Sequence, residues 1–391
     1  MGDINIKETI SDKKSFFNVK LFSLKNLGKD FCLKTFDISK ARKKTFEDNK
    51  ELRNKNIIFE KSKFIKTFDE IEKIKKETDN QTINKFFGRQ AWLDDKFTLF
   101  HATLKFNPYK NIEKLEEIEG FLHYYYSFSK NIVLIPNVRT HYTPLDEDGK
   151  WNSKNKVQII SLKEYIILID DLYEFFEQRN NKPIFVPISL KFNIGEIKEL
   201  VEHSLKKERY YFWIDFESAP ADLSDAIIGG KLGQINSLFR DSKYFEKILV
   251  FATNIKREII SNQKGDKSPA SDVLGMICGA NFVGVDRDPM RGFKVTDEQK
   301  KKKIIEHKSR FFDSNTYYYN IKREQKPDIC FNVTSNSIKL AGEFSKQKKH
   351  FLENGEIENY LRNKEMITTF KGGKILKSLL AKGKKFQKKF F

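Results

Sequence analysis

The sequence predicts an α/β protein: a (β/α)8 TIM-type barrel with an N-terminal extension and a basic C-terminal tail. Five short apolar runs, each ending on polar residues, are the main evidence, and they span residues 132–139, 183–191, 210–217, 247–254 and 281–288. Segments with helical periodicity lie between them at residues 162–178, 194–207 and 221–245. Strand and helix therefore alternate at a spacing of about 30 residues, which is typical of parallel strands joined by helical crossovers.

The remaining elements are expected in chain order on either side of these runs. Residues 1–94 mix Lys, Asn, Glu and Phe, with a strand-like piece at 56–59 and a helical stretch at 68–77, and we expect an N-terminal extension or a small α+β subdomain. The barrel is expected over residues 95–345, from a strand at 97–106 and a helix at 112–127 to a last strand at 328–333. Residues 346–391 are expected to form a basic C-terminal helix, at 356–362, and tail.

These runs give seven candidate strands, one fewer than a complete (β/α)8 barrel requires. An open, doubly wound parallel sheet is the alternative arrangement of the same elements. Because no Gly-rich dinucleotide or phosphate loop follows any of the strands, the barrel is the favoured interpretation.

The composition indicates a soluble protein of the reducing cytoplasm. With 391 residues and 39% hydrophobic content, the chain can bury a large core without disulfides. Its three cysteines, Cys32, Cys278 and Cys330, are too scattered for a disulfide framework or a zinc site with paired cysteines. Neither a secretory signal nor an apolar run of membrane-spanning length is present, so no membrane partner is expected. No motif identifies a cofactor, a metal site or an oligomeric state.

The charge predicts a polyanionic partner, most simply DNA or tRNA. Lys and Arg number 73 against 54 Asp and Glu, which leaves a net charge of +19. A Lys-rich and Phe-rich composition also follows from an AT-rich genome. However, the lysines cluster: residues 371–389 contain eight lysines and no acid, and residues 300–303 are an unbroken lysine run.

Polar residues at the carboxyl ends of the expected strands make up the candidate site. In parallel α/β sheets the chemistry lies beyond these ends. Asp215 is a candidate catalytic acid/base, because Tyr211 and Trp213 precede it at strand spacing and place it over an aromatic layer. The candidate substrate-binding residues are Asn137, Arg139, Ser189, Lys191, Glu217 and Asn254, together with Arg291 further along the chain.

Residues 268–292 contain the most family-like pattern, SPASDVLGMICGANFVGVDRDPMRG. Its Ser268-Pro269 and Asp272, then Gly279, Asp286, Pro289 and Arg291, resemble the tRNA-guanine transglycosylase superfamily, which includes phage and bacterial DNA-modifying relatives. The resemblance covers about 25 residues, and the zinc ligands and base-recognition segments of that family have no counterpart here. It implies that Asp286 is the nucleophile that attacks the sugar carbon and expels the base.

The expected function is therefore a nucleic-acid-modifying barrel enzyme that acts on a base or its glycosidic linkage. Asp286 is the expected nucleophile and Asp215 the acid/base, while Arg139, Lys191 and Arg291 hold phosphate. One alternative is a non-catalytic nucleic-acid-binding or assembly protein on a barrel scaffold. Another is metal-assisted phosphoryl transfer, for which carboxylates at positions 215, 217, 286 and 288 would be oxygen ligands for a hard cation.

Overall fold

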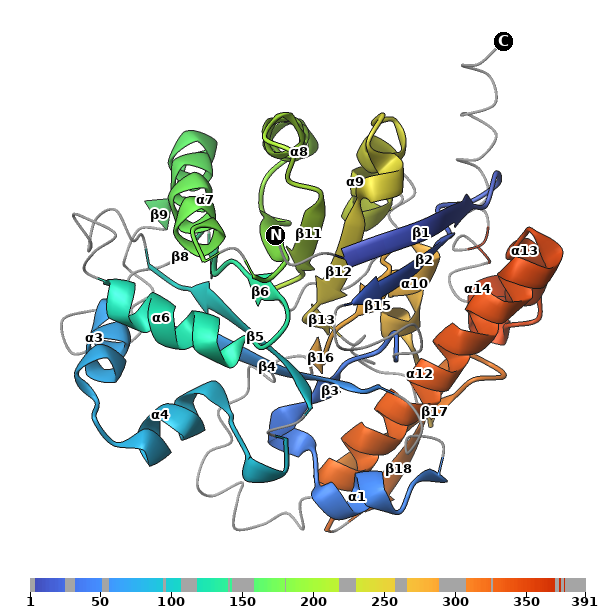
Figure 1. The fold of residues 1–391 in the computed structure, drawn as a ribbon. Coiled ribbons are helices and arrows are strands. Elements are labelled where there is room, and N and C mark those ends of the chain that lie inside the picture. Colours follow the sequence, from blue (N-terminus) through green and yellow to red (C-terminus); the bar gives the residue numbers. More distant parts are fainter. Residues whose placement is uncertain are drawn as a thin grey trace.

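The computed structural model describes residues 4–24, 32–50, 56–93, 96–106, 118–139, 141–142, 158–179, 181–217, 230–256, 266–287, 307–324, 326–369, 373 and 376. Within them the chain forms a mixed α/β fold around curled parallel sheets (Figure 1). No helix in these ranges has the length and apolar character needed to cross a membrane.

Two parallel sheets form the centre of the fold. The first has the strand order β15-β12-β11-β10-β6 and contains β6 (Val133–Leu134), β10 (Ile184–Ser189), β11 (Tyr211–Asp215), β12 (Leu249–Thr253) and β15 (Phe282–Val283). The second has the order β3-β4-β5-β7 and contains β3 (Phe36–Asp37), β4 (Ile58–Ile65), β5 (Phe97–Leu104) and β7 (Asn137–Val138). A further parallel pair, β13 (Ile255–Lys256) and β16 (Asp286–Arg287), follows β12 and β15.

The two sheets are connected at both edges. Strands β6 and β7 lie on one short stretch of chain, residues 133–138, so this stretch pairs with β10 on one side and β5 on the other. At the opposite edge Lys34, just before β3, forms a parallel bridge with Val283 of β15. The Thr35 amide donates to the Val283 carbonyl at 2.9 Å, and the Val283 amide donates to the Leu33 carbonyl at 2.8 Å.

Helices cover the outer face of these sheets (Figure 1). Helices α7 and α8 each begin at a capping box, Ser161 with Glu164 and Asn193 with Glu196, which satisfies the first free amides of the helix. The helices are α1 (Lys43–Glu47), α3 (Phe68–Lys76), α4 (Asn80–Phe87), α6 (Glu119–Phe128), α7 (Leu162–Glu177), α8 (Ile194–Lys206), α9 (Gly230–Arg240), α10 (Leu274–Ile277), α12 (Ile329–Asn354), α13 (Glu358–Arg362) and α14 (Glu365–Thr369).

Antiparallel elements are added around the parallel sheets. The hairpin of β1 (Ile4–Ser11) and β2 (Asn18–Leu24) lies across the sheet near β12 and β15 (Figure 1). A three-stranded sheet of order β14-β18-β17 contains β14 (Lys267–Pro269), β17 (His307–Asp313) and β18 (Tyr318–Glu324) and packs on α12. Strands β8 (His141–Tyr142) and β9 (Gln158–Ile159) form a separate pair.

Side chains of the central strands alternate between two hydrophobic clusters. In β11, Phe212 and Ile214 belong to the large cluster that includes the buried faces of the helices, whereas Trp213 belongs to a smaller cluster. The smaller cluster draws on both parallel sheets and on the β1–β2 hairpin, so it fills the interior around which the strands curl. Residues two positions beyond its members, such as Asp215 after Trp213, are therefore aimed along the same inward line.

Two sequence expectations about the elements are wrong. Residues 328–333 do not form a closing strand: Asp328 accepts a hydrogen bond from the Phe331 amide and caps α12. Its apolar residues Ile329 and Phe331 are 54% and 53% exposed at the start of this helix, whereas a closing barrel strand would bury them. The sequence pattern of residues 268–280 also predicts a small helix, but this segment forms strand β14, a 3-10 turn over Ser271–Val273 and the short helix α10.

The expected domain boundaries also fall within continuous structure. The boundary between residues 94 and 95 separates β4 from β5, yet these strands pair in parallel over eight residues, from Ile58 with Phe97 to Ile65 with Leu104. The boundary at residues 345 and 346 lies inside α12. The sequence predicts a separate N-terminal region because a strand as short as β3, with two residues, leaves no convincing alternation of strand and helix there.

Gly284, between β15 and β16, is predicted to tolerate no side chain. A Cβ there would lie 2.2 Å from Thr253 Oγ1 and 2.7 Å from Glu60 Oε2, inside the curled sheet. We expect Gly284→Ala to lower the free energy of unfolding by about 2 kcal/mol, as overpacking of buried sites does. The measurement is urea unfolding followed by circular dichroism.

Gly342→Ala is the matched control, because a Cβ at this position in α12 meets nothing within 4 Å. Helix propensity alone should then raise stability by up to about 1 kcal/mol. Equal effects of the two substitutions would contradict the close packing at Gly284.

Candidate active site

Buried polar side chains form a layer at the carboxyl ends of the central strands. Four of them lie two residues beyond an apolar residue of the interior cluster, on the same inward line, as Asp215 does after Trp213 and Thr253 after Phe251. The layer is shut off from solvent, with exposures of 0–1%. Its members are Glu60, His101, Thr103, Asn137, Ser189, Asp215, Thr253 and Asn254.

Asp215 is held by four donors. Thr103 Oγ1 donates to its Oδ2 at 2.5 Å, and Asn137 Nδ2 approaches the same oxygen at 3.5 Å. Its Oδ1 accepts from Asn254 Nδ2 at 2.8 Å and from the Glu217 amide at 2.9 Å. Because both carboxylate oxygens are engaged, the side chain is fixed in orientation, and the donors offset the cost of burying it.

The donors to Asp215 are themselves positioned. Tyr165 of α7 donates to Asn137 Oδ1 at 2.8 Å, and Ser62 of β4 donates to Asn254 Oδ1 at 3.2 Å. Asn254 has a φ of 57°, in the left-handed region that asparagine tolerates better than most residues. Its amide donates to the Val285 carbonyl at 2.9 Å, which ties the Asp215 site to the strand that carries Asp286.

Glu217 lies two residues beyond Asp215 and has a φ of 47°, an uncommon conformation for glutamate. Ser189 Oγ donates to its Oε1 at 3.1 Å, and Arg139 Nε lies 3.5 Å from its Oε2. Burial and the neighbouring charge of Asp215 raise the pKa of Glu217 to about 7, against the opposing effects of Arg139, Ser189 and Lys191. Glu217 can therefore both give and accept a proton near neutral pH.

Asp286 lies two strands from Asp215 along the curled sheet. β11 pairs with β12, and β13, which continues β12, pairs with β16, so two strand spacings of about 4.8 Å each and a register offset of two residues separate the backbones at Asp215 and Asp286. Lys34 Nζ contacts Asp286 Oδ1 at 2.9 Å and also donates to the Gly284 carbonyl. Both side chains are nearly inaccessible, with 1% of Lys34 and 4% of Asp286 exposed.

A third buried carboxylate, Glu60 of β4, joins strands from both sheets. It accepts from Thr253 Oγ1 at 2.6 Å, from the Val285 amide at 3.0 Å and from Thr35 Oγ1, and His101 Nε2 lies 2.7 Å away. Burial would raise the pKa of Glu60, but His101 and the two threonines outweigh it, so the pKa of Glu60 is lowered. The Glu60 network thus fixes the strand that leads into Asp286.

The structure brings together most of the residues that the sequence singled out. Asp215, Glu217, Asn137, Asn254, Ser189 and Arg139 form one contact network. Lys191 is exposed at its edge, where its amide donates to Ser189 Oγ at 3.3 Å. Positions 288 and 291, Asp288 and Arg291, lie outside the described residues.

Sequence reasoning missed Lys34 and Glu60, and it did not connect His101 with a partner. Both missed residues lie in the N-terminal region that was expected to be separate from the barrel. A signal was present in each case: Lys34 interrupts the apolar stretch of Cys32, Leu33 and Phe36, and Glu60 follows two apolar residues, Ile58 and Phe59. A charged residue in such a stretch indicates a buried partner.

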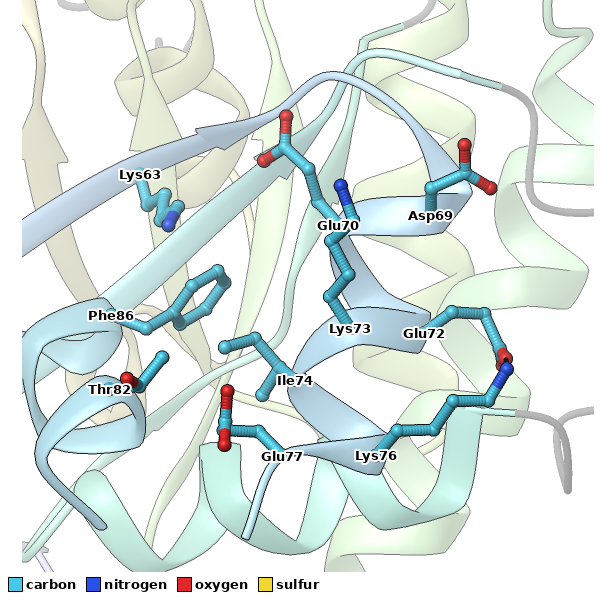
Figure 2. A pocket seen from close by; sticks show the side chains of 10 residues that line it. All are labelled: Lys63, Asp69, Glu70, Glu72, Lys73, Ile74, Lys76, Glu77, Thr82 and Phe86. Carbon is cyan, nitrogen blue, oxygen red and sulfur yellow. Dashed lines mark ion pairs between the residues drawn. The ribbon is translucent and has the colours of Figure 1, made fainter. Parts of the chain in front are cut away.

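No cluster of three or more His, Cys, Asp or Glu residues with metal-binding geometry occurs in the described ranges. Figure 2 shows an open hollow of about 710 Å³ between β4 and helices α3 and α4, where Lys63 Nζ lies 3.2 Å from the centre of the Phe86 ring. Its lining includes Glu70, Lys73 and Glu77 but none of the strand-end residues, so it is not part of the candidate site.

Comparison with known proteins assigns no family. The chain matches no protein-family model, and no curated protein matches it.

We predict that Glu217 makes folding stability depend on pH. Its folded pKa of about 7 lies above the ordinary value of 4.5, so the folded state holds a proton that the unfolded state has released between these values. The free energy of unfolding should therefore fall by about 3 kcal/mol through this contribution as the pH rises from about 4 to about 7.

The measurement is the difference between the wild type and Glu217→Gln in urea unfolding across this range. Taking the difference removes the opposite slopes of carboxylates whose pKa is lowered, such as Asp170 and Asp313. Parallel pH profiles of the two proteins would show that Glu217 titrates normally.

Proposed function

We propose that the parallel strands complete a (β/α)8 barrel. Eight stretches of chain support this proposal: those around β3, β4, β5, β6–β7, β10, β11, β12–β13 and β15–β16, each pairing in parallel with the next. The Lys34–Val283 bridge joins the last stretch to the first. An α-helix follows each of the eight in the chain, with α12 after the last.

In this barrel the protein acts as a nucleic-acid-modifying enzyme on a base or its glycosidic linkage. The observation that carries this proposal is the Glu217 side chain, which is 3% exposed, has a pKa of about 7, and lies at the strand ends that also carry the nearly inaccessible side chains of Asp215 and Asp286. Enzymes that cleave bonds to sugar C1′ use this combination of a group that exchanges protons near pH 7 and a separate carboxylate.

Asp286 is the proposed nucleophile. Its carboxylate oxygen attacks C1′ of the nucleotide, the bond from C1′ to the base nitrogen breaks, and the departing base takes a proton from Glu217. In the return step Glu217 removes a proton from an incoming base, whose nitrogen displaces Asp286 from C1′. Lys34, at 2.9 Å, keeps Asp286 oriented and compensates its charge.

This proposal moves the acid/base role from Asp215 to Glu217. Both oxygens of Asp215 already accept hydrogen bonds from fixed donors, which leaves it no open direction in which to deliver a proton. The charge of Asp215 helps to raise the pKa of Glu217, so Asp215 acts through its neighbour. It is a positioning residue in this scheme.

The first test measures turnover separately from binding. The full-length chain is incubated with tRNA or duplex DNA and labelled free bases, and exchange into the nucleic acid is followed. Asp286→Asn and Glu217→Gln should each lower turnover by about 10³-fold or more while binding is retained. Asp241→Asn, at an exposed position, is the control and should keep full activity.

Full activity of both active-site variants would refute this chemistry. Nucleic-acid binding with no exchange in the wild type would instead favour a binding protein on a barrel scaffold.

The second test concerns the partner. A chain with a net charge of +19 should release counterions when it binds DNA or tRNA, so its association constant should fall by at least about tenfold between 50 and 200 mM salt. Fluorescence anisotropy of a labelled duplex measures this. Affinity that does not change with salt would exclude phosphate contacts as the main source of binding.

A further inference from the structure

Four neighbouring strand ends repeat one pattern: an uncharged polar residue or Asp215, one intervening residue, and then a charged residue. The pairs are Thr103 with Lys105, Asn137 with Arg139, Ser189 with Lys191, and Asp215 with Glu217. The strands are parallel neighbours, in the order β5, β7 (continuous with β6), β10 and β11. Because residues two apart share one side of a strand, the charged members form a second layer above the buried one.

Three of the four charges in this second layer are positive and lie next to one another. Burial lowers the pKa of Lys105, and repulsion by Arg139 and Lys66 lowers it further, against the weaker attraction of Glu217 and Glu70. Lys191 is exposed and repels Lys231 in the same way. Glu217 thus lies among these cations, while Glu70 acts on Lys105 and Glu196 on Lys231.

Two polar atoms between these groups have no hydrogen-bond partner among the described residues. They are Arg139 Nε and Glu217 Oε2, which are both buried. Their separation of 3.5 Å is an ion-pair contact that falls short of a well-formed hydrogen bond. A buried donor and a buried acceptor that lie side by side without hydrogen bonds, below a group of cations, indicate a place for a ligand atom.

We propose that Lys105, Arg139 and Lys191 bind a tetrahedral oxyanion, a phosphate group of the substrate, and that its binding loads Glu217 with a proton from solvent. The inference rests on the proposed function, where it identifies the phosphodiester as the group that the site holds and sets the protonation state of the acid. Arg139 turns from Glu217 to the anion, which removes a stabilising cation from the carboxylate and adds a negative charge beside it. Both changes favour the protonated form of Glu217.

The sign of the coupling follows from every charged or titratable group that faces Glu217. Asp215 on its own strand and burial already favour the protonated form, while Arg139, Ser189 and Lys191 oppose it. Lys105 of β5 and Tyr165 of α7 also interact with Glu217 electrostatically. Because anion binding withdraws the opposing cations, the free protein takes up a proton on binding, and the anion binds more weakly as the pH rises through 7.

Sulfate is the probe, because it is a tetrahedral dianion that does not titrate between about pH 5 and 9. Isothermal titration of the full-length chain with sulfate, in two buffers of different ionisation enthalpy, gives the affinity and the number of protons taken up. Glu217 is already about half protonated at pH 7, so we expect uptake of up to about half a proton there, and an affinity at least about threefold weaker at pH 8 than at pH 6.

Three variants and one control separate the contributions. Glu217→Gln should still bind sulfate, with no proton uptake and no change in affinity between these pH values. Lys105→Arg keeps its charge throughout and should keep the wild-type dependence, which shows that deprotonation of Lys105 is not its cause. Arg139→Gln should weaken binding by about tenfold or more, whereas Lys198→Gln, 59% exposed on the outside of α8, is the control and should have no effect.

Absence of sulfate binding, or binding that Arg139→Gln leaves unchanged, would overturn the anion site. Binding without proton uptake would overturn its coupling to Glu217. Neither readout depends on catalysis. If Asp286→Asn keeps full base exchange while sulfate binding is still accompanied by proton uptake, the proposed reaction is refuted and this inference stands.

Discussion

The structure depends on the compensation of three carboxylates, Glu60, Asp215 and Asp286, that are buried inside the curled parallel sheet. An uncompensated buried charge would cost several kcal/mol, comparable with the whole stability of a domain. Each carboxylate meets this constraint differently: Glu60 has His101 and two threonines, Asp215 has neutral donors, and Asp286 has Lys34. The partners come from other strands, so the charges tie the strand ends together.

This constraint also explains the unusual backbone at the strand ends. Asn254 and Glu217 both have positive φ angles, and both contribute a donor to Asp215, one through the side-chain amide and the other through the backbone amide. Gly284 leaves room for Thr253 and Glu60 to meet beside the strand that leads to Asp286. Local strain at Asn254 and Glu217 thus orients a carboxylate, and the surrounding hydrogen bonds hold it in place.

The two layers of the site divide structural from chemical roles. In the lower layer the described donors to Asp215 are all neutral, so its negative charge acts on Glu217 in the layer above. In the upper layer Glu217 lies between that charge and the positive side chains of the neighbouring strand ends, and these opposing influences leave its pKa of about 7 sensitive to anything that moves a cation. An anionic substrate would draw such a cation away from Glu217 when it binds.

The sequence by itself determined the parallel alternation of strand and helix, and it placed the polar strand ends correctly. Apolar runs that end on Asn137, Ser189 and Asp215 predict both, because parallel strands share one carboxyl edge and side chains two apart share one face. It did not determine which charges meet. Lys34 and Asp286 are 252 residues apart in sequence, and Glu60 is 41 residues from His101. Short elements such as β3 carry almost no periodicity, so their place in the sheet comes from tertiary pairing alone. The same limit applies to protonation: the pattern shows two acidic residues at 215 and 217, but only the packed structure gives one of them four donors and the other a buried, partly open carboxylate.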